Sequence, residues 1–110
     1  MEVARGAIVV VAAKGPYTGK PRPALVVQAD PFNAAHASVT LCPITTDCVD
    51  APLFRVTLTP GAQNGLSTVS QVMVDKIVSV PRIAIARTIG RCDSVHLDQI
   101  DDALRLWLGL

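Results

Sequence analysis

A basic, proline-flanked segment leads directly into an apolar strand at residues 20–28, which read Lys20-Pro21-Arg22-Pro23-Ala24-Leu25-Val26-Val27-Gln28. Proline fixes φ and has no backbone N–H, so Pro21 and Pro23 stiffen the chain on both sides of Arg22. A stiff backbone reduces the entropy that is lost when Arg22 becomes ordered on a ligand. Because the planar guanidinium of arginine matches a phosphate, Arg22 is a candidate phosphate ligand at the start of a predicted strand over 24–28.

Other strands are expected on both sides of this segment. β-branched runs and alternating apolar and polar residues predict strands at 7–13, 38–42, 54–58, 67–73 and 76–80. From Val95 to Leu108 the apolar residues recur at helical spacing, with Asp93 or Ser94 as the cap. Short strands followed by one helix predict a mainly β (α+β) fold. We expect a small antiparallel barrel with a C-terminal helix, in a single domain over 1–110.

The composition limits the classes of function. The 110 residues are half apolar, only four of them are Trp, Tyr or Phe, and the net charge is +1. A protein that coats nucleic acid through bulk charge needs a large positive excess, so any such contact here must come from a local basic patch. Nothing in the sequence reads as a signal peptide, and the apolar run at 7–13 is too short to span a membrane.

The cysteine and histidine pattern does not predict a metal site. The three cysteines, Cys42, Cys48 and Cys92, show no Cys-x-x-Cys spacing, and the two histidines lie far apart in sequence. An odd cysteine count with this spacing argues against a structural zinc site and against a disulfide framework. We therefore expect reduced thiols, a cytoplasmic location, and neither a metal nor another cofactor.

A second group of polar residues follows the predicted strand at 38–42. In Pro43-Ile44-Thr45-Thr46, two hydroxyls stand where the buried strand stops. Taken alone, a threonine pair after a strand also fits a turn or a cap, and an arginine between prolines also fits a solvated loop. The functional interpretation therefore depends on the order in which these segments occur.

Six segments in this order resemble the MazF/PemK toxin family over nearly the whole chain. They are Arg5 to Val9, Pro21 to Asp30, Pro43 to Thr46, Val72 to Ile77, Ile89 to Arg91, and Leu104 to Leu110. The stretch from Pro21 to Asp30 is the most diagnostic. The resemblance implies a small SH3-like barrel, a homodimer with RNA in a groove near its interface, and a toxin that an antitoxin protein holds in check.

The resemblance also implies a metal-independent endoribonuclease that cuts single-stranded RNA at short sequences. The family's catalytic arginine and threonine fall on Arg22 and Thr45. The ribose 2′-OH would attack the phosphate, Arg22 would stabilise the charge that develops there, and Thr45 would donate a second hydrogen bond. The expected products carry a 2′,3′-cyclic phosphate and a 5′-OH.

The general base is the part of this site that the sequence defines least. Many relatives carry an acidic residue in the loop before the arginine, whereas residues 14–20 contain none. Asp75 matches an acidic family position and is the candidate base, with a structural hydrogen-bond acceptor as the alternative. The candidate RNA-binding residues are Lys14, Tyr17, Lys20 and Thr46. Among them Tyr17 could stack on a base, although residues 14–20 also fit an exposed loop without a ligand.

Two other functions are compatible with the sequence. A CcdB-like DNA gyrase poison shares the barrel, and Trp107-Leu108-Gly109-Leu110 loosely resembles the tail of that relative. CcdB-like chains lack the Pro-Arg-Pro segment and the threonine pair, however, and Trp107 and Leu108 already belong to the apolar stripe of the helix. The other alternative is a degenerate, non-catalytic toxin that only binds its antitoxin, because the loop before Arg22 lacks an acid.

Overall fold

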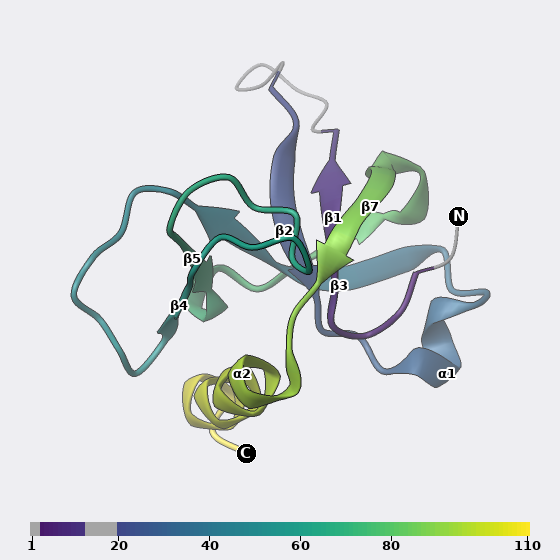
Figure 1. The fold of residues 1–110 in the computed structure, drawn as a ribbon. Helices are drawn as coiled ribbons and strands as arrows, with labels where there is room; N and C mark the ends of the chain where they lie inside the picture. The colour runs from purple at the N-terminus through teal and green to yellow at the C-terminus, as the bar shows by residue number, and fades with distance from the viewer. Residues whose placement is uncertain (1–2, 13–19) are drawn as a thin grey trace.

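The computed structural model describes residues 3–12 and 20–110 (Figure 1). Within these ranges the chain forms seven strands, two α-helices and two short 3-10 helices. Their order is β1 (Ala7–Val11), β2 (Arg22–Val26), α1 (Asp30–Asn33), β3 (Ser38–Thr45), β4 (Arg55–Leu58), β5 (Ser70–Met73), η1 (Val74–Lys76), β6 (Val78–Pro81), η2 (Arg82–Ala84), β7 (Ile85–Arg91) and α2 (Ser94–Leu108).

The strands pair in antiparallel fashion around β3. The path of paired strands is β4-β5-β3-β2-β1-β7, and β6 pairs with β3 as well. β5 and β6 pair with the same edge of β3, one after the other, and η1 lies between them in the chain. Between the pairs Ile44–Val72 and Leu41–Val78, β3 advances three residues while its partner advances six. The extra residues bulge out as η1, which removes Asp75 from the ladder.

The strands do not close a barrel, which corrects one part of the predicted fold. Within 3–12 and 20–110, β4 and β7 end the path without pairing to each other. The loop after β4 spans the gap, and Gln63 accepts a hydrogen bond from the Arg91 N–H at 2.9 Å. The loop comes so close to β7 that a Cβ at Gly90 would lie 2.3 Å from the Asn64 carbonyl carbon. A loop therefore occupies the place where a closing strand pair would lie.

The antiparallel strands and the C-terminal helix were predicted correctly. β7 was missed, because its residues alternate poorly and most of them are exposed. Helix α2 begins at a cap in which Asp93 accepts a hydrogen bond from the His96 N–H at 2.9 Å. It ends at Gly109, whose φ of 71° is left-handed.

Two apolar clusters lie on opposite faces of the central strands, because side chains alternate along a strand. The α2-side core contains Ile8, Leu25, Cys42, Ile44, Val56, Val72 and, from the helix, Ile100 and Ala103. The opposite core contains Ala7, Val9, Ala24, Val26, Val39, Leu41 and Ile85. Both clusters contain side chains of β1, β2 and β3, so these strands are packed on both faces. This packing fixes the positions of the strands that carry the candidate site.

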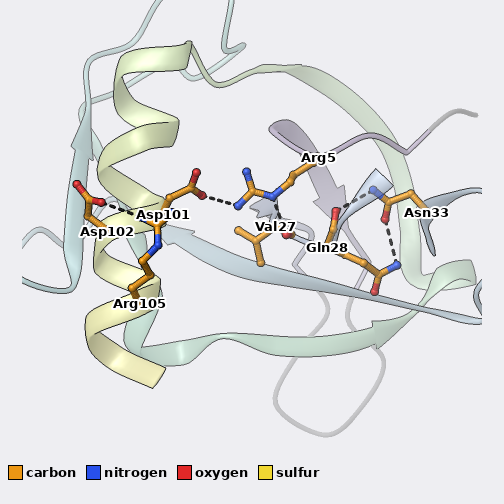
Figure 2. Close-up of polar contacts among 7 residues, drawn as sticks. All are labelled: Arg5, Val27, Gln28, Asn33, Asp101, Asp102 and Arg105. Carbon is orange, nitrogen blue, oxygen red and sulfur yellow. Dashed lines mark hydrogen bonds and ion pairs between the residues drawn. The ribbon is translucent and has the colours of Figure 1, made fainter. Parts of the chain in front are cut away.

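Arg5 ties the start of the chain to α2 (Figure 2). Its Nε donates to the Val27 carbonyl at 3.0 Å, and its Nη2 forms an ion pair with Asp101. The Arg5 backbone N–H donates to the Asp30 carboxylate at 2.7 Å, and this bond lowers the pKa of Asp30. Arg5 and Asp30 belong to segments that carried the family resemblance, and here their polar groups serve the fold.

No helix among the described residues is long and apolar enough to cross a membrane.

Candidate active site

The register of β2 and β3 brings Arg22 and Thr45 to the same end of the sheet. Ala24 lies opposite Pro43, and Leu25 lies opposite Cys42. Arg22 and Thr45 each stand two residues beyond the Ala24–Pro43 pair, so continuing this register places them opposite one another. The strands are antiparallel, and for that reason the start of β2 meets the end of β3.

The side chains of Arg22 and Thr45 also share one face. Ala24 and Val26 of β2 belong to the opposite core, as does Leu41 of β3. Arg22 lies two residues before Ala24, and Thr45 lies four residues after Leu41. Since side chains point to alternate faces, even spacing places both residues on the face of that core. Arg22 is exposed and Thr45 is half-buried, so a ligand can reach both side chains.

The Thr45 hydroxyl is oriented by the turn that follows β3. Its Oγ1 accepts a hydrogen bond from the Asp47 backbone N–H at 3.0 Å. A hydroxyl that accepts one such bond still has its own hydrogen free to donate. Thr45 can therefore act as a donor to a phosphate oxygen, in keeping with its predicted role.

The other predicted RNA contacts divide into two groups. Lys20 and Thr46 are both exposed, Lys20 just before β2 and Thr46 just after β3. They therefore flank Arg22 and Thr45 in sequence at the same end of the sheet. Lys14 and Tyr17 lie outside the described residues. The four ion pairs among the described residues do not involve Lys20 or Arg22.

Asp75, the candidate base, is held by a neighbouring arginine. Arg55 donates from Nε to Asp75 Oδ1 at 2.8 Å and from Nη2 to Oδ2 at 3.2 Å. Both side chains are largely buried, with exposed fractions of 12% for Arg55 and 16% for Asp75. The hydrogen bonds from Arg55 lower the pKa of Asp75. A carboxylate held in this way takes up a proton less readily, which weakens it as a general base.

The sequence reasoning missed Gln71, which stands in the same row of the sheet as Thr45. Gln71 lies opposite Thr45 on β3 and opposite Thr57 on β4. It is 6% exposed, so its amide is buried among strands. The sequence signal for it is a glutamine inside the predicted strand at 67–73, because a polar side chain in a buried strand needs hydrogen-bond partners. The structure shows that Ser70, Gln71 and Val72 are buried.

Two of the three cysteines, Cys42 and Cys92, are buried and contribute no reactive thiol, whereas Cys48 is exposed in the segment after β3. Cys42 lies in the α2-side core, where burial raises the pKa of its thiol to about 12. Burial likewise raises the pKa of Cys92 to about 11. A thiol with so high a pKa is a poor nucleophile near neutral pH. In the described part of the chain, no three His, Cys, Asp or Glu side chains gather in a group that could hold a metal ion.

Comparison with known proteins now identifies the family. The family model for PemK-like, MazF-like toxins of type II toxin–antitoxin systems matches residues 4–108. A curated relative from Mycolicibacterium smegmatis, named as a probable endoribonuclease MazF, is 47% identical over 106 residues, which cover 96% of each chain. The endoribonuclease MazF9 of Mycobacterium tuberculosis is 31% identical over 103 residues, which cover 89% of this chain and 86% of the relative.

A solved structure agrees with these matches. The MazE–MazF crystal structure from Deinococcus radiodurans (Form-II) contains a chain that is 26% identical. It superposes with a TM-score of 0.82 and covers 100% of this chain and 98% of its own. None of these matches supports the alternative of a CcdB-like gyrase poison. The chain belongs to the family of PemK-like, MazF-like toxins of type II toxin–antitoxin systems, whose curated relatives are endoribonucleases.

Proposed function

We propose that residues 1–110 form one toxin domain that cuts single-stranded RNA, and that Arg22 and Thr45 jointly hold the scissile phosphate. The observation that carries this proposal is the β2–β3 register, which supports a shared face and a shared sheet end for the two side chains. Endoribonuclease relatives that match nearly the whole chain support the same activity.

The two side chains perform complementary tasks in this mechanism. RNA supplies its own nucleophile, the ribose 2′-OH next to each phosphodiester. Arg22 offers a fixed positive charge and paired donors to the oxygens of the phosphorane, where negative charge develops. A donor aimed at such charge contributes on the order of 3 kcal/mol to lowering the barrier. Thr45 adds a hydroxyl donor that the Asp47 N–H has already oriented.

The bond changes define the products. The 2′-oxygen forms a bond to phosphorus as its proton leaves, and the bond from phosphorus to the 5′-oxygen breaks. The leaving 5′-oxygen takes up a proton. The products are a 2′,3′-cyclic phosphate and a 5′-OH, and no step uses a metal ion.

A role for Asp75 as the third catalytic residue is part of this proposal. Its ion pair with Arg55, however, favours a structural role over that of a general base. The lowered pKa of Asp75 disfavours proton uptake from the 2′-OH. The two hydrogen bonds to Arg55 instead suit a carboxylate that fixes the β4–η1 contact beside the site. We therefore rank Asp75 below Arg22 and Thr45.

The proposed partners are RNA, a cognate antitoxin and a second copy of this chain. The exposed cations Lys20 and Arg22 suit the phosphates of RNA and also an acidic, disordered antitoxin tail that would compete with RNA. Apolar side chains at the end of α2 support a homodimer, since Leu106, Trp107 and Leu110 are 60%, 48% and 86% exposed in the single chain. We place the protein in the cytoplasm, where RNA and the antitoxin are made.

A cleavage assay without divalent metal tests the proposal. Purified protein is mixed with labelled single-stranded RNA in the presence of a chelator, and the new ends are analysed chemically. We expect cyclic phosphate and 5′-OH ends, and a loss of about 100- to 1,000-fold in rate for Arg22→Ala. A substrate with a 2′-deoxy sugar at the cut position should stay intact, and its cleavage would contradict the proposed nucleophile.

The same assay separates the alternative of a degenerate toxin. A folded wild-type protein that binds its antitoxin but leaves RNA intact and does not inhibit growth would support that alternative instead.

A further inference from the structure

Gln71 forms a clamp on the loop that follows the proposed catalytic threonine. Its Oε1 accepts from the Val49 N–H at 3.0 Å, and its Nε2 donates to the Val49 carbonyl at 2.9 Å. The same Nε2 lies 3.3 Å from Thr57 Oγ1. In an antiparallel sheet, two paired residues exchange both N–H···O bonds. Here the side-chain amide of Gln71 takes the place of such a paired residue.

The clamp fixes the far end of a short segment that begins at Thr45. At its near end, Thr45 is held in the ladder by its pairing with Gln71. Asp47, two residues on, donates its N–H to Thr45 Oγ1 at 3.0 Å. Val49, two residues further, is held by the Gln71 side chain. The direction of the Asp47 N–H therefore depends on where Val49 is anchored.

We propose that Gln71 is a positioning residue that acts through Val49 and Asp47 to orient the Thr45 hydroxyl toward the phosphate. This inference rests on the proposed function. The hydroxyl can rotate about its C–O bond, and the Asp47 N–H selects the rotamer in which the hydroxyl hydrogen is free to donate. If the clamp is removed, the turn can relax and the hydroxyl loses this preference. Catalysis depends on such preorganised donors.

Gln71 is buried, so its side-chain amide needs hydrogen-bond partners, and the Val49 backbone supplies two of them. A buried side-chain amide without a partner carries a desolvation cost, so the two bonds hold Gln71 and Val49 together. Gln71→Leu keeps a similar volume and removes both hydrogen bonds between the Gln71 side chain and Val49, while the bond from the Ala51 N–H to the Val49 carbonyl remains. The matched control is Thr57→Val, which removes the contact between Thr57 Oγ1 and Gln71 Nε2 and leaves both bonds to Val49.

A double-mutant cycle with Thr45 tests the proposal. We expect Gln71→Leu to lower kcat for RNA cleavage about tenfold, while the Kd for an uncleavable 2′-deoxy RNA changes less than twofold. In a Thr45→Val background, the same substitution should change kcat less than twofold, because the hydroxyl it orients is gone. Thr57→Val should retain the wild-type kcat. A residue with only a structural role would affect both backgrounds equally, and that additive result would overturn the proposal.

A second readout does not depend on activity. Amide hydrogen exchange at Asp47 should be faster in Gln71→Leu than in wild type, and unchanged exchange would also overturn the proposal. If Gln71→Leu does not fold, Gln71→Glu serves instead, because its protonated form can donate to the Val49 carbonyl as glutamine does. Its kcat relative to wild type should rise as the pH is lowered from 8 to 5, and a constant ratio would count against the clamp.

The outcomes also separate this inference from the proposed function. If the wild-type protein shows no cleavage that depends on Thr45, the proposed function fails and the inference fails with it. If cleavage depends on Thr45 but the cycle is additive, only the role of Gln71 is wrong.

Discussion

Asp75 receives two hydrogen bonds from one guanidinium, with Arg55 Nε at 2.8 Å from Oδ1 and Nη2 at 3.2 Å from Oδ2. This pair joins η1 to the edge strand β4, at the point where the extra residues of η1 leave the ladder. A bidentate arginine–carboxylate pair with little exposure is among the stronger polar contacts in a protein. The pair therefore fixes η1, which directly follows β5, against β4, the strand that pairs with β5.

Asp75→Asn should lower the free energy of unfolding by about 1–3 kcal/mol, because charge-assisted bonds become neutral ones. The reduction in RNA cleavage should be smaller than for Arg22→Ala. The measurements are urea unfolding and the cleavage rate, with the exposed Asp50→Asn as the control. If Asp75→Asn abolishes cleavage without changing stability, Asp75 is the general base.

Stability should fall in acid through Asp75, Asp30 and Asp93, whose pKa values are all lowered by hydrogen bonds in the folded state. A carboxyl with a lowered folded pKa contributes stability above its unfolded value, about 3.9, and loses it as the pH falls through the folded pKa. Urea unfolding at pH 7, 4 and 3 should show this loss below about pH 4. The loss should be smaller in Asp75→Asn, and an equal loss in that variant would contradict the role of the Arg55 pair.

Gly90→Ala should destabilise the fold by about 1–3 kcal/mol, as expected for overpacking. The added Cβ would lie 2.3 Å from the Asn64 carbonyl carbon, and backbone cannot move aside as a flexible side chain can. Gly61→Ala is the matched control, because a Cβ there meets nothing within 4 Å. Thermal unfolding of the two variants measures the difference. Equal melting temperatures would show that the loop does not rest on β7.

Arg5→Met should cost about 1–3 kcal/mol of stability, since it leaves the Val27 carbonyl and Asp101 without their guanidinium partner. Arg105→Met removes an ion pair to Asp102 whose side chains are 62% and 81% exposed, and it should cost less than about 1 kcal/mol. Chemical denaturation of both variants gives the comparison. A larger effect at Arg105 would refute this account of how α2 is attached.

Arg22→Lys should retain part of the cleavage activity. Lysine keeps the positive charge but lacks the planar fork that forms two parallel bonds to a phosphate. We expect a rate between those of wild type and Arg22→Ala, with unchanged stability because Arg22 is exposed. Wild-type rates in both Arg22 variants would show that the arginine is not part of the catalytic centre.

Local patterns in the sequence were sufficient for the elements with strong periodicity. The apolar run after Arg22 predicted β2, because a strand buried on both faces leaves a continuous apolar run. The helical spacing from Val95 to Leu108 predicted α2, because burial on one face leaves a period in the sequence. They were insufficient for β7, whose exposed residues leave no such period. They also could not show that a loop, rather than a strand pair, would fill the space between β4 and β7.

The sequence by itself determined the family and the two residue types of the candidate site. Arg22 and Thr45 lie in short motifs, and the order of these motifs along the chain is typical of the family. Only the tertiary structure decided that they share an end and a face of the sheet, since this depends on the β2–β3 register. It also decided that Asp75 is bound to Arg55 and that Gln71 clamps Val49. These partners lie more than 19 residues apart in sequence, and contacts at that distance are made by strand pairing and burial, which no local pattern encodes.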